Sequence, residues 1–188
     1  SNIDLGTAKV IITAVEDSNY IGSRTFTFNI LGRALSSVRF DAALTKNYSW
    51  FDKVAPWTES EGWKPLDTEK SLYNIVNREN VYLKGIAKAD FEALSYDNPA
   101  DNKRIYDYTY EYVGDTKNVG TVKLILTGVN GYTGVVNKSY GILGKAISSV
   151  RYDAALTANY NWSAEGWRPV KPNESLYNIV NGQNVGLK

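Results

Sequence analysis

The sequence predicts an all-β fold in which β-sandwich modules are repeated along the chain. Three observations carry this prediction: several segments alternate between apolar and polar side chains, glycine and asparagine turns separate them, and long stretches occur twice. Period-two alternation is typical of strands with one buried face. Short strands at regular spacing, separated by turn residues, indicate a sandwich.

Two hairpins follow from the alternation. The run from Val122 to Thr127 is apolar and β-branched, and glycine and asparagine at 128–131 interrupt it before a second predicted strand from Tyr132 to Ile142. A similar pair of predicted strands lies at 8–13 and 20–30, around a polar turn. Two such runs joined by a short turn are the signature of a β-hairpin.

A ladder of tyrosines predicts a further strand. Tyr106, Tyr108, Tyr110 and Tyr112 alternate with polar residues. A strand places such residues on one face, whereas a helix would scatter them around its axis.

The segment 146–160 fits two structures. As a helix it groups Ile147, Val150 and Ala154, and as a strand it points Val150, Tyr152 and Ala154 inward. We favour the strand, because the neighbouring segments are all predicted to be β.

Internal repetition organises the chain. The repeated segments are SSVRFDAALT at 36–45 and SSVRYDAALT at 148–157, SLYNIVN at 71–77 and 175–181, and, more loosely, 6–31 and 120–143. The period is about 105 to 115 residues, the size of one domain. The first copy carries about eight extra residues around 51–58, which we expect to form a loop.

The repetition alone leaves the division of the chain open. One possible division is into two domains, 1–84 and 85–188.

Composition narrows the function. The 188 residues contain no cysteine, histidine or methionine, and 21 basic and 20 acidic residues give a net charge of +1. Thiolate and imidazole nucleophiles, bases and metal ligands are therefore excluded, and we expect neither an enzyme nor a cofactor. The chain has no basic stripe for nucleic acid and no apolar run long enough to span a membrane.

Short motifs resemble tandem bacterial immunoglobulin-like repeats of secreted or cell-surface proteins. They are Asn118-Val119-Gly120-Thr121, Gly131-Tyr132-Thr133-Gly134, Tyr140-Gly141-Ile142 and the segment Asp90 to Asn98. The resemblance implies immunoglobulin-like β-sandwich repeats and a non-catalytic structural or adhesive role in a stalk or fibre. It also implies three parts: residues 1–32 are the C-terminal strands of a preceding repeat, 33–143 are a complete repeat, and 144–188 are the N-terminal strands of a following one. It departs from the family in a longer segment 97–117 and a high tryptophan content.

The same resemblance implies a location outside the cell or on its surface. No signal peptide is visible, and Ser1-Asn2 looks like the remnant of a removed tag. We therefore expect the export signal to lie outside this sequence.

The tryptophans suggest an alternative function. Clustered aromatic rings on a sandwich can stack on sugars, so a carbohydrate-binding module or an adhesin for a host surface protein is the second hypothesis. The candidate ligand-binding residues are Trp50, Trp57, Trp63, Trp162 and Trp167. The repeated pairs 50/162 and 63/167 favour a core role, whereas Trp57, in the extra loop, is the better candidate for contact.

Two further expectations concern metals and self-association. The cluster Asp97, Asn98, Asp101 and Asn102 fits no calcium loop, and such residues usually form turns, so we predict no metal site. The hairpin in 1–32 lacks the strands that 144–188 supply, and we expect the two to pair head to tail between chains.

Overall fold

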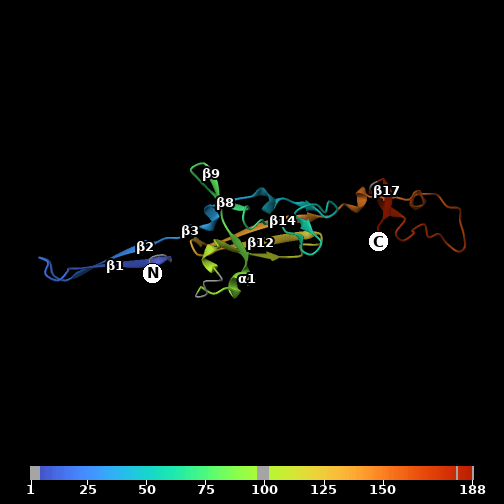
Figure 1. Cartoon of the computed structure of the whole chain (residues 1–188). Helices are drawn as coiled ribbons and strands as arrows, with labels where there is room; N and C mark the ends of the chain where they lie inside the picture. Colours follow the sequence, from blue (N-terminus) through green and yellow to red (C-terminus); the bar gives the residue numbers. More distant parts are fainter. Residues whose placement is uncertain (1–4, 97–101, 181, 188) are drawn as a thin grey trace. The chain divides into compact units, whose positions relative to one another are not determined.

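A computed structural model describes residues 5–96, 102–180 and 182–187 of the chain (Figure 1). Strands make up 42% of it, which confirms the predicted all-β class. The α-helical residues of the described part are those of α1 (Lys88–Ala93). Among the described residues, no helix has the length and apolar character needed to cross a membrane.

The remaining elements are short strands and single turns of 3-10 helix. The strands are β1 (Gly6–Thr13), β2 (Ser23–Ile30), β3 (Arg33–Ala34), β4 (Arg39–Phe40), β5 (Tyr48–Ser49), β6 (Trp57–Thr58), β7 (Gly62–Trp63), β8 (Leu72–Val76), β9 (Glu79–Tyr82), β10 (Gly85–Ala87), β11 (Tyr108–Val113), β12 (Gly120–Gly128), β13 (Tyr132–Thr133), β14 (Val135–Leu143), β15 (Arg151–Tyr152), β16 (Leu176–Val180) and β17 (Gln183–Gly186). The 3-10 helices are η1 (Leu35–Ser37), η2 (Ala42–Thr45), η3 (Lys103–Ile105), η4 (Ile147–Ser149) and η5 (Ala154–Leu156).

The chain divides into two compact units, Ser1–Leu143 and Gly144–Lys188. In the first unit, the largest sheet has the strand order β10-β11-β12-β14-β5. The predicted hairpin is its centre, because β12 pairs antiparallel with β14. Strand β11 carries Tyr108, Tyr110 and Tyr112 of the tyrosine ladder and pairs antiparallel with β12, so the predicted strand is confirmed from Tyr108 onward, and Tyr106 precedes it.

One core joins parts of the chain that are distant in sequence. Its fully buried members are Leu35, Val38, Leu44, Leu72, Leu83, Tyr108, Leu124 and Leu126. The first five come from the segment 33–84 and the last two from β12, with Tyr108 of β11 between them in sequence. The hairpin β12–β14 therefore packs against the segment 33–84, and the burial of these apolar side chains is the main stabilising contribution.

The N-terminal strands form a second hairpin with the same register. In β1–β2, Ala8 lies opposite Phe28, as Val122 lies opposite Tyr140 in β12–β14. The predicted hairpin is confirmed.

The second unit reproduces the 3-10 helices and the three-stranded sheet of the segment 33–84. The Asp153 carboxylate accepts the N–H of Ala155 at 2.7 Å, as Asp41 accepts that of Ala43 at 2.7 Å. The sheet β15-β16-β17 has the same order and register as β4-β8-β9. The two copies of this sequence thus adopt the same local structure.

The strand favoured for 146–160 is wrong for most of that segment. Only Arg151–Tyr152 is extended in a sheet, and the 3-10 helices η4 and η5 flank it. Local hydrogen bonds explain the difference: Ser149 Oγ donates to the carbonyl of Ala146 at 2.7 Å, and Asp153 caps η5. Serine and aspartate side chains that bond to nearby backbone favour turns over strands.

Candidate functional site

The aromatic cluster is the first candidate site, and its centre is buried. Trp63 is 1% exposed and stacks on Tyr48, with ring centroids 4.8 Å apart. Tyr140 meets Tyr48 edge to face at 5.6 Å, and Val122 and Ile142 complete this second core. The core role expected for Trp63 is confirmed, so its ring presents no surface to a ligand.

Trp57 does not stand in an unpartnered loop, and that expectation is wrong. It lies in β6, which pairs antiparallel with β7 and places Trp57 opposite Trp63. The ring is half-buried and packs against the same core as Trp63. The extra residues of the first copy therefore lead into a small hairpin instead of an open loop.

Trp50 and Trp57 share one cation. Trp50 is half-buried, and its indole N–H donates to the carbonyl of Lys117 at 3.0 Å. The Lys53 ammonium lies 4.5 Å from the centroid of Trp50 and 4.9 Å from that of Trp57. Such contacts are favourable cation–π interactions, so the chain's own lysine covers these two rings.

The tryptophans of the second unit are exposed, so the core role expected for Trp162 and Trp167 is wrong within this unit. Trp167 stacks on Tyr160 at 4.7 Å, as Trp63 stacks on Tyr48, yet it is 55% exposed. Trp162, the counterpart of Trp50, is 88% exposed. The stack is thus preformed, but the side chains that bury it in the first copy have no equivalent within this unit.

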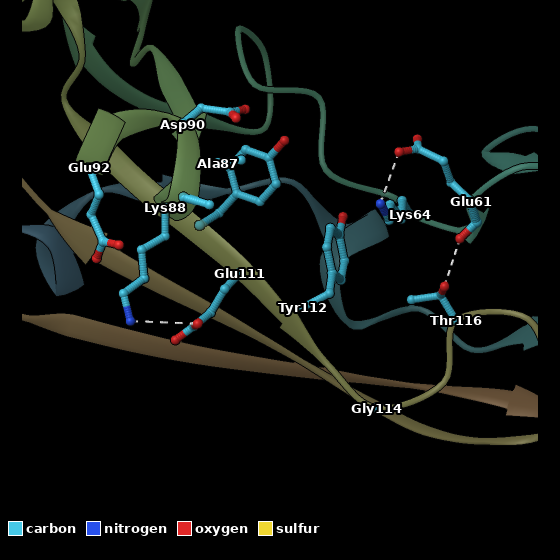
Figure 2. A pocket seen from close by; sticks show the side chains of 12 residues that line it. Glu61, Lys64, Ala87, Lys88, Asp90, Glu92, Glu111, Tyr112, Gly114 and Thr116 are labelled. Atoms are coloured by element: carbon cyan, nitrogen blue, oxygen red, sulfur yellow. Dashed lines mark hydrogen bonds and ion pairs between the residues drawn. The ribbon is translucent and has the colours of Figure 1, made fainter. Parts of the chain in front are cut away.

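A groove beside the tyrosine ladder is the second candidate site (Figure 2). Its volume is about 670 Å³, and α1, β11 and the segment around β7 contribute to its walls. The residues that line it with polar groups are Glu61, Lys64, Lys88, Asp90, Glu92, Tyr110, Glu111, Tyr112 and Thr116.

Several charges of the groove are paired. Lys64 lies 3.0 Å from Glu61, and Lys88 lies 3.6 Å from Glu111. The hydroxyl of Tyr112 accepts the N–H of Leu66, and burial raises the pKa of this tyrosine above its ordinary value. The groove therefore offers tyrosine rings and charges of both signs to a polar ligand. Its ion pairs and the hydrogen bond at Tyr112 join residues of the module to one another.

Two aspartates with shifted pKa values also have structural roles. Burial raises the pKa of Asp107, whose carboxylate accepts the backbone N–H of Lys84 at 2.8 Å. Hydrogen bonds from the Asn118 side chain and the Lys117 backbone lower the pKa of Asp115. The Asp107 carboxylate joins the residue before β11 to the residue before β10, and the Asp115 carboxylate fixes the turn that follows β11.

The described residues hold no group of three or more acidic side chains arranged for a metal ion. Of the acidic cluster considered for calcium, Asp97, Asn98 and Asp101 lie outside the described residues. Asn102 precedes η3 with a positive φ of 42°, which is a turn conformation.

No family model, no curated protein and no solved structure matches the chain. The structure itself defines the class: an all-β protein in which two sequence copies share one local fold.

Proposed function

We propose that the chain is a non-catalytic structural module of a bacterial surface or secreted protein, built of immunoglobulin-like β-sandwich repeats and acting in a stalk or fibre. The observation that carries the proposal is the use made of the repeated residues. In both copies several of them form the same internal hydrogen bonds.

Three pairs of contacts illustrate this use. The hydroxyls of Tyr48 and Tyr160 donate to the carbonyls of Ala43 and Ala155, each the second residue of its aspartate-capped 3-10 helix. Ser71 Oγ accepts the N–H of Asp67, and Ser175 Oγ accepts that of Lys171. The carbonyls of Leu72 and Leu176 accept the N–H groups of Leu83 and Leu187.

Repetition that preserves a fold is what a tandem structural protein needs, because each module contributes length and stiffness instead of a unique site. Two sheets packed across a core of alternating side chains, with strands from distant parts of the chain, are consistent with an immunoglobulin-like sandwich. The proposed surface location follows from the sequence resemblance.

The location can be tested on intact cells of the bacterium that carries the gene. An antibody against residues 33–143 should label cells before permeabilisation, to the same extent as after it. A cytosolic protein labelled in parallel provides the control, since it should require permeabilisation. Labelling of permeabilised cells alone would contradict the surface location.

A carbohydrate-binding module is the second candidate, and the pair Trp50 and Trp57 favours it. Both rings are partly accessible, and Lys53 lies over them. We expect Lys53→Ala to strengthen binding to a glycan panel, because it uncovers two rings, and Trp57→Ala to abolish it. Fluorescence titration measures both. A panel that binds neither the wild-type chain nor Lys53→Ala rules this candidate out.

A further inference from the structure

Both ends of the chain carry one half of the same module. In the complete module, the hairpin β12–β14 buries its apolar face against the segment 33–84. The hairpin β1–β2 is a copy of the hairpin β12–β14, and the unit Gly144–Lys188 is a partial copy of the segment 33–84. The chain therefore shows, within itself, how these two kinds of surface fit together.

The apolar face of β1–β2 is the copy of a face that is buried elsewhere. Val10 and Ile12 correspond to the fully buried Leu124 and Leu126 of β12, and both are exposed. Phe28 and Ile30 correspond to Tyr140 and Ile142, which cover Trp63. Phe28 is also exposed. Exposed apolar faces of this kind mark interaction sites.

The unit Gly144–Lys188 lacks the side chains that cover its aromatic rings. Its stack of Tyr160 on Trp167 is the counterpart of the stack that Tyr140 and Val122 bury in the complete module, but here both rings are exposed. Ile147, the counterpart of the buried Leu35, is exposed as well.

Backbone pairing supplies a register for the contact. In the complete module, Ile142 and Leu143 of β14 pair in parallel with Tyr48 and Ser49 of β5, and the backbone N–H of Trp50 donates to the carbonyl of Leu143 at 2.9 Å. The equivalent backbone groups are the carbonyl of the exposed Leu31 and the N–H of the exposed Trp162.

The tip of the hairpin has counterparts too. Strand β13 pairs in parallel with β3, and the Tyr132 hydroxyl accepts from the Asn74 side chain at 2.8 Å. Tyr20 and Ile21 correspond to Tyr132 and Thr133, and both are almost fully exposed. Asn178 corresponds to Asn74.

We propose that the hairpin β1–β2 of one chain docks on the unit Gly144–Lys188 of a second copy and completes a sandwich there, in the register of β12–β14 on residues 33–84. The contact joins two different surfaces, so it is heterologous and can extend into a filament or close into a ring. It does not depend on where the protein resides.

One substitution pair fits the proposed contact. In the complete module, the Lys138 ammonium lies 4.0 Å from the centroid of the Phe40 ring. At the joint, Phe26 replaces this lysine and Tyr152 replaces the phenylalanine, and both are exposed. An aromatic pair would thus take the place of a cation–π pair.

Other differences weaken the joint relative to the complete module. Arg24 stands at the position of Val136, and Phe28 lacks the hydroxyl that Tyr140 donates to the carbonyl of Trp63. The strands β10 and β11 have no copy beside β1. We therefore expect an association that depends on concentration.

The test uses two adjacent residues of β1. Ile12, on the docking face, is 61% exposed, and Ile11, on the opposite face, is 64% exposed. Light scattering should show a mass that rises with concentration for the wild-type chain and for Ile11→Asp, but a monomer for Ile12→Asp. A monomeric wild-type chain at every concentration overturns the proposal, as does equal loss of association in both variants.

Complementation guards against misfolded variants. The Ile12→Asp chain keeps its accepting unit, and a Trp167→Asp chain keeps its hairpin. Each alone should be monomeric, whereas their equimolar mixture should double in mass and stop at the dimer. A mixture that stays monomeric, with wild-type chains associating under the same conditions, would also overturn the proposed register.

Discussion

Replacing Trp63 by alanine should lower the free energy of unfolding of the central module by about 3–5 kcal/mol. The indole is fully buried, stacks on Tyr48 and is covered by Tyr140 and Ile142, so its removal leaves a large cavity between β7 and β14. For a domain of this size, the melting temperature should fall by about 12–20 °C, which calorimetry measures.

Two matched variants separate the possible causes. Trp63→Phe keeps an aromatic ring and removes an indole N–H that has no hydrogen-bond partner among the described residues, so it should cost far less than alanine. Trp167→Ala removes the equivalent, half-exposed ring of the second unit and should cost about 1 kcal/mol or less in the monomer. Equal losses for Trp63→Ala and Trp167→Ala would show that the second unit is as well packed as the first.

The hairpins and the tyrosine ladder could be predicted from sequence, because they depend on alternation between neighbours. Successive side chains of a strand point to opposite faces of the sheet, which places Leu124 and Leu126 on one face of β12 and sets the face of β11 that carries Tyr108. The face that a side chain occupies therefore depends on its own strand alone. The all-β class follows from the same local signal.

The structure of the segments 36–45 and 148–157 cannot be predicted from alternation, because it depends on local hydrogen bonds between side chains and the nearby backbone. Asp41 caps η2 and Asp153 caps η5, so that in each copy a short 3-10 helix ends the apparent strand. The position of the Trp57 ring cannot be predicted for a different reason: its partner strand, β7, follows after a gap of three residues, and no periodic pattern extends over two-residue strands.

The groove of Figure 2 illustrates the limit for the site. Its residues come from the two ends of β7, from α1 and from β11 and the turn after it, which are far apart in sequence and meet only in the folded module. The short helix α1 has no periodic apolar face that would predict it. The repeated tryptophans could be found from sequence, but their exposure depends on whether a hairpin covers them.

Alkaline pH should also have a large effect, because ionisation of the buried tyrosines should unfold the central module. Burial raises the pKa values of Tyr108, Tyr112 and Tyr140 well above the ordinary value of about 10. Below that pH these side chains are neutral in both states, and the stability that they contribute is fully present. As the pH rises above about 10, the unfolded chain releases their protons while the folded chain retains them, so the unfolded state becomes more favourable.

The expected slope follows from this linkage. Each retained proton lowers the free energy of unfolding by about 1.4 kcal/mol per pH unit, and three tyrosines together by about 4 kcal/mol per pH unit, until their raised pKa values are reached. Urea titrations at a series of pH values above neutrality measure this slope.

Tyr108→Phe should reduce it by about a third, even though it also loses the bond from the tyrosine hydroxyl to the carbonyl of Thr68. The half-exposed Tyr82→Phe is the control and should leave the slope unchanged. A stability that stays level up to strongly alkaline pH would mean that these hydroxyls ionise as readily in the folded module as in the unfolded chain, and that the tyrosines of β11 and β14 are in contact with water.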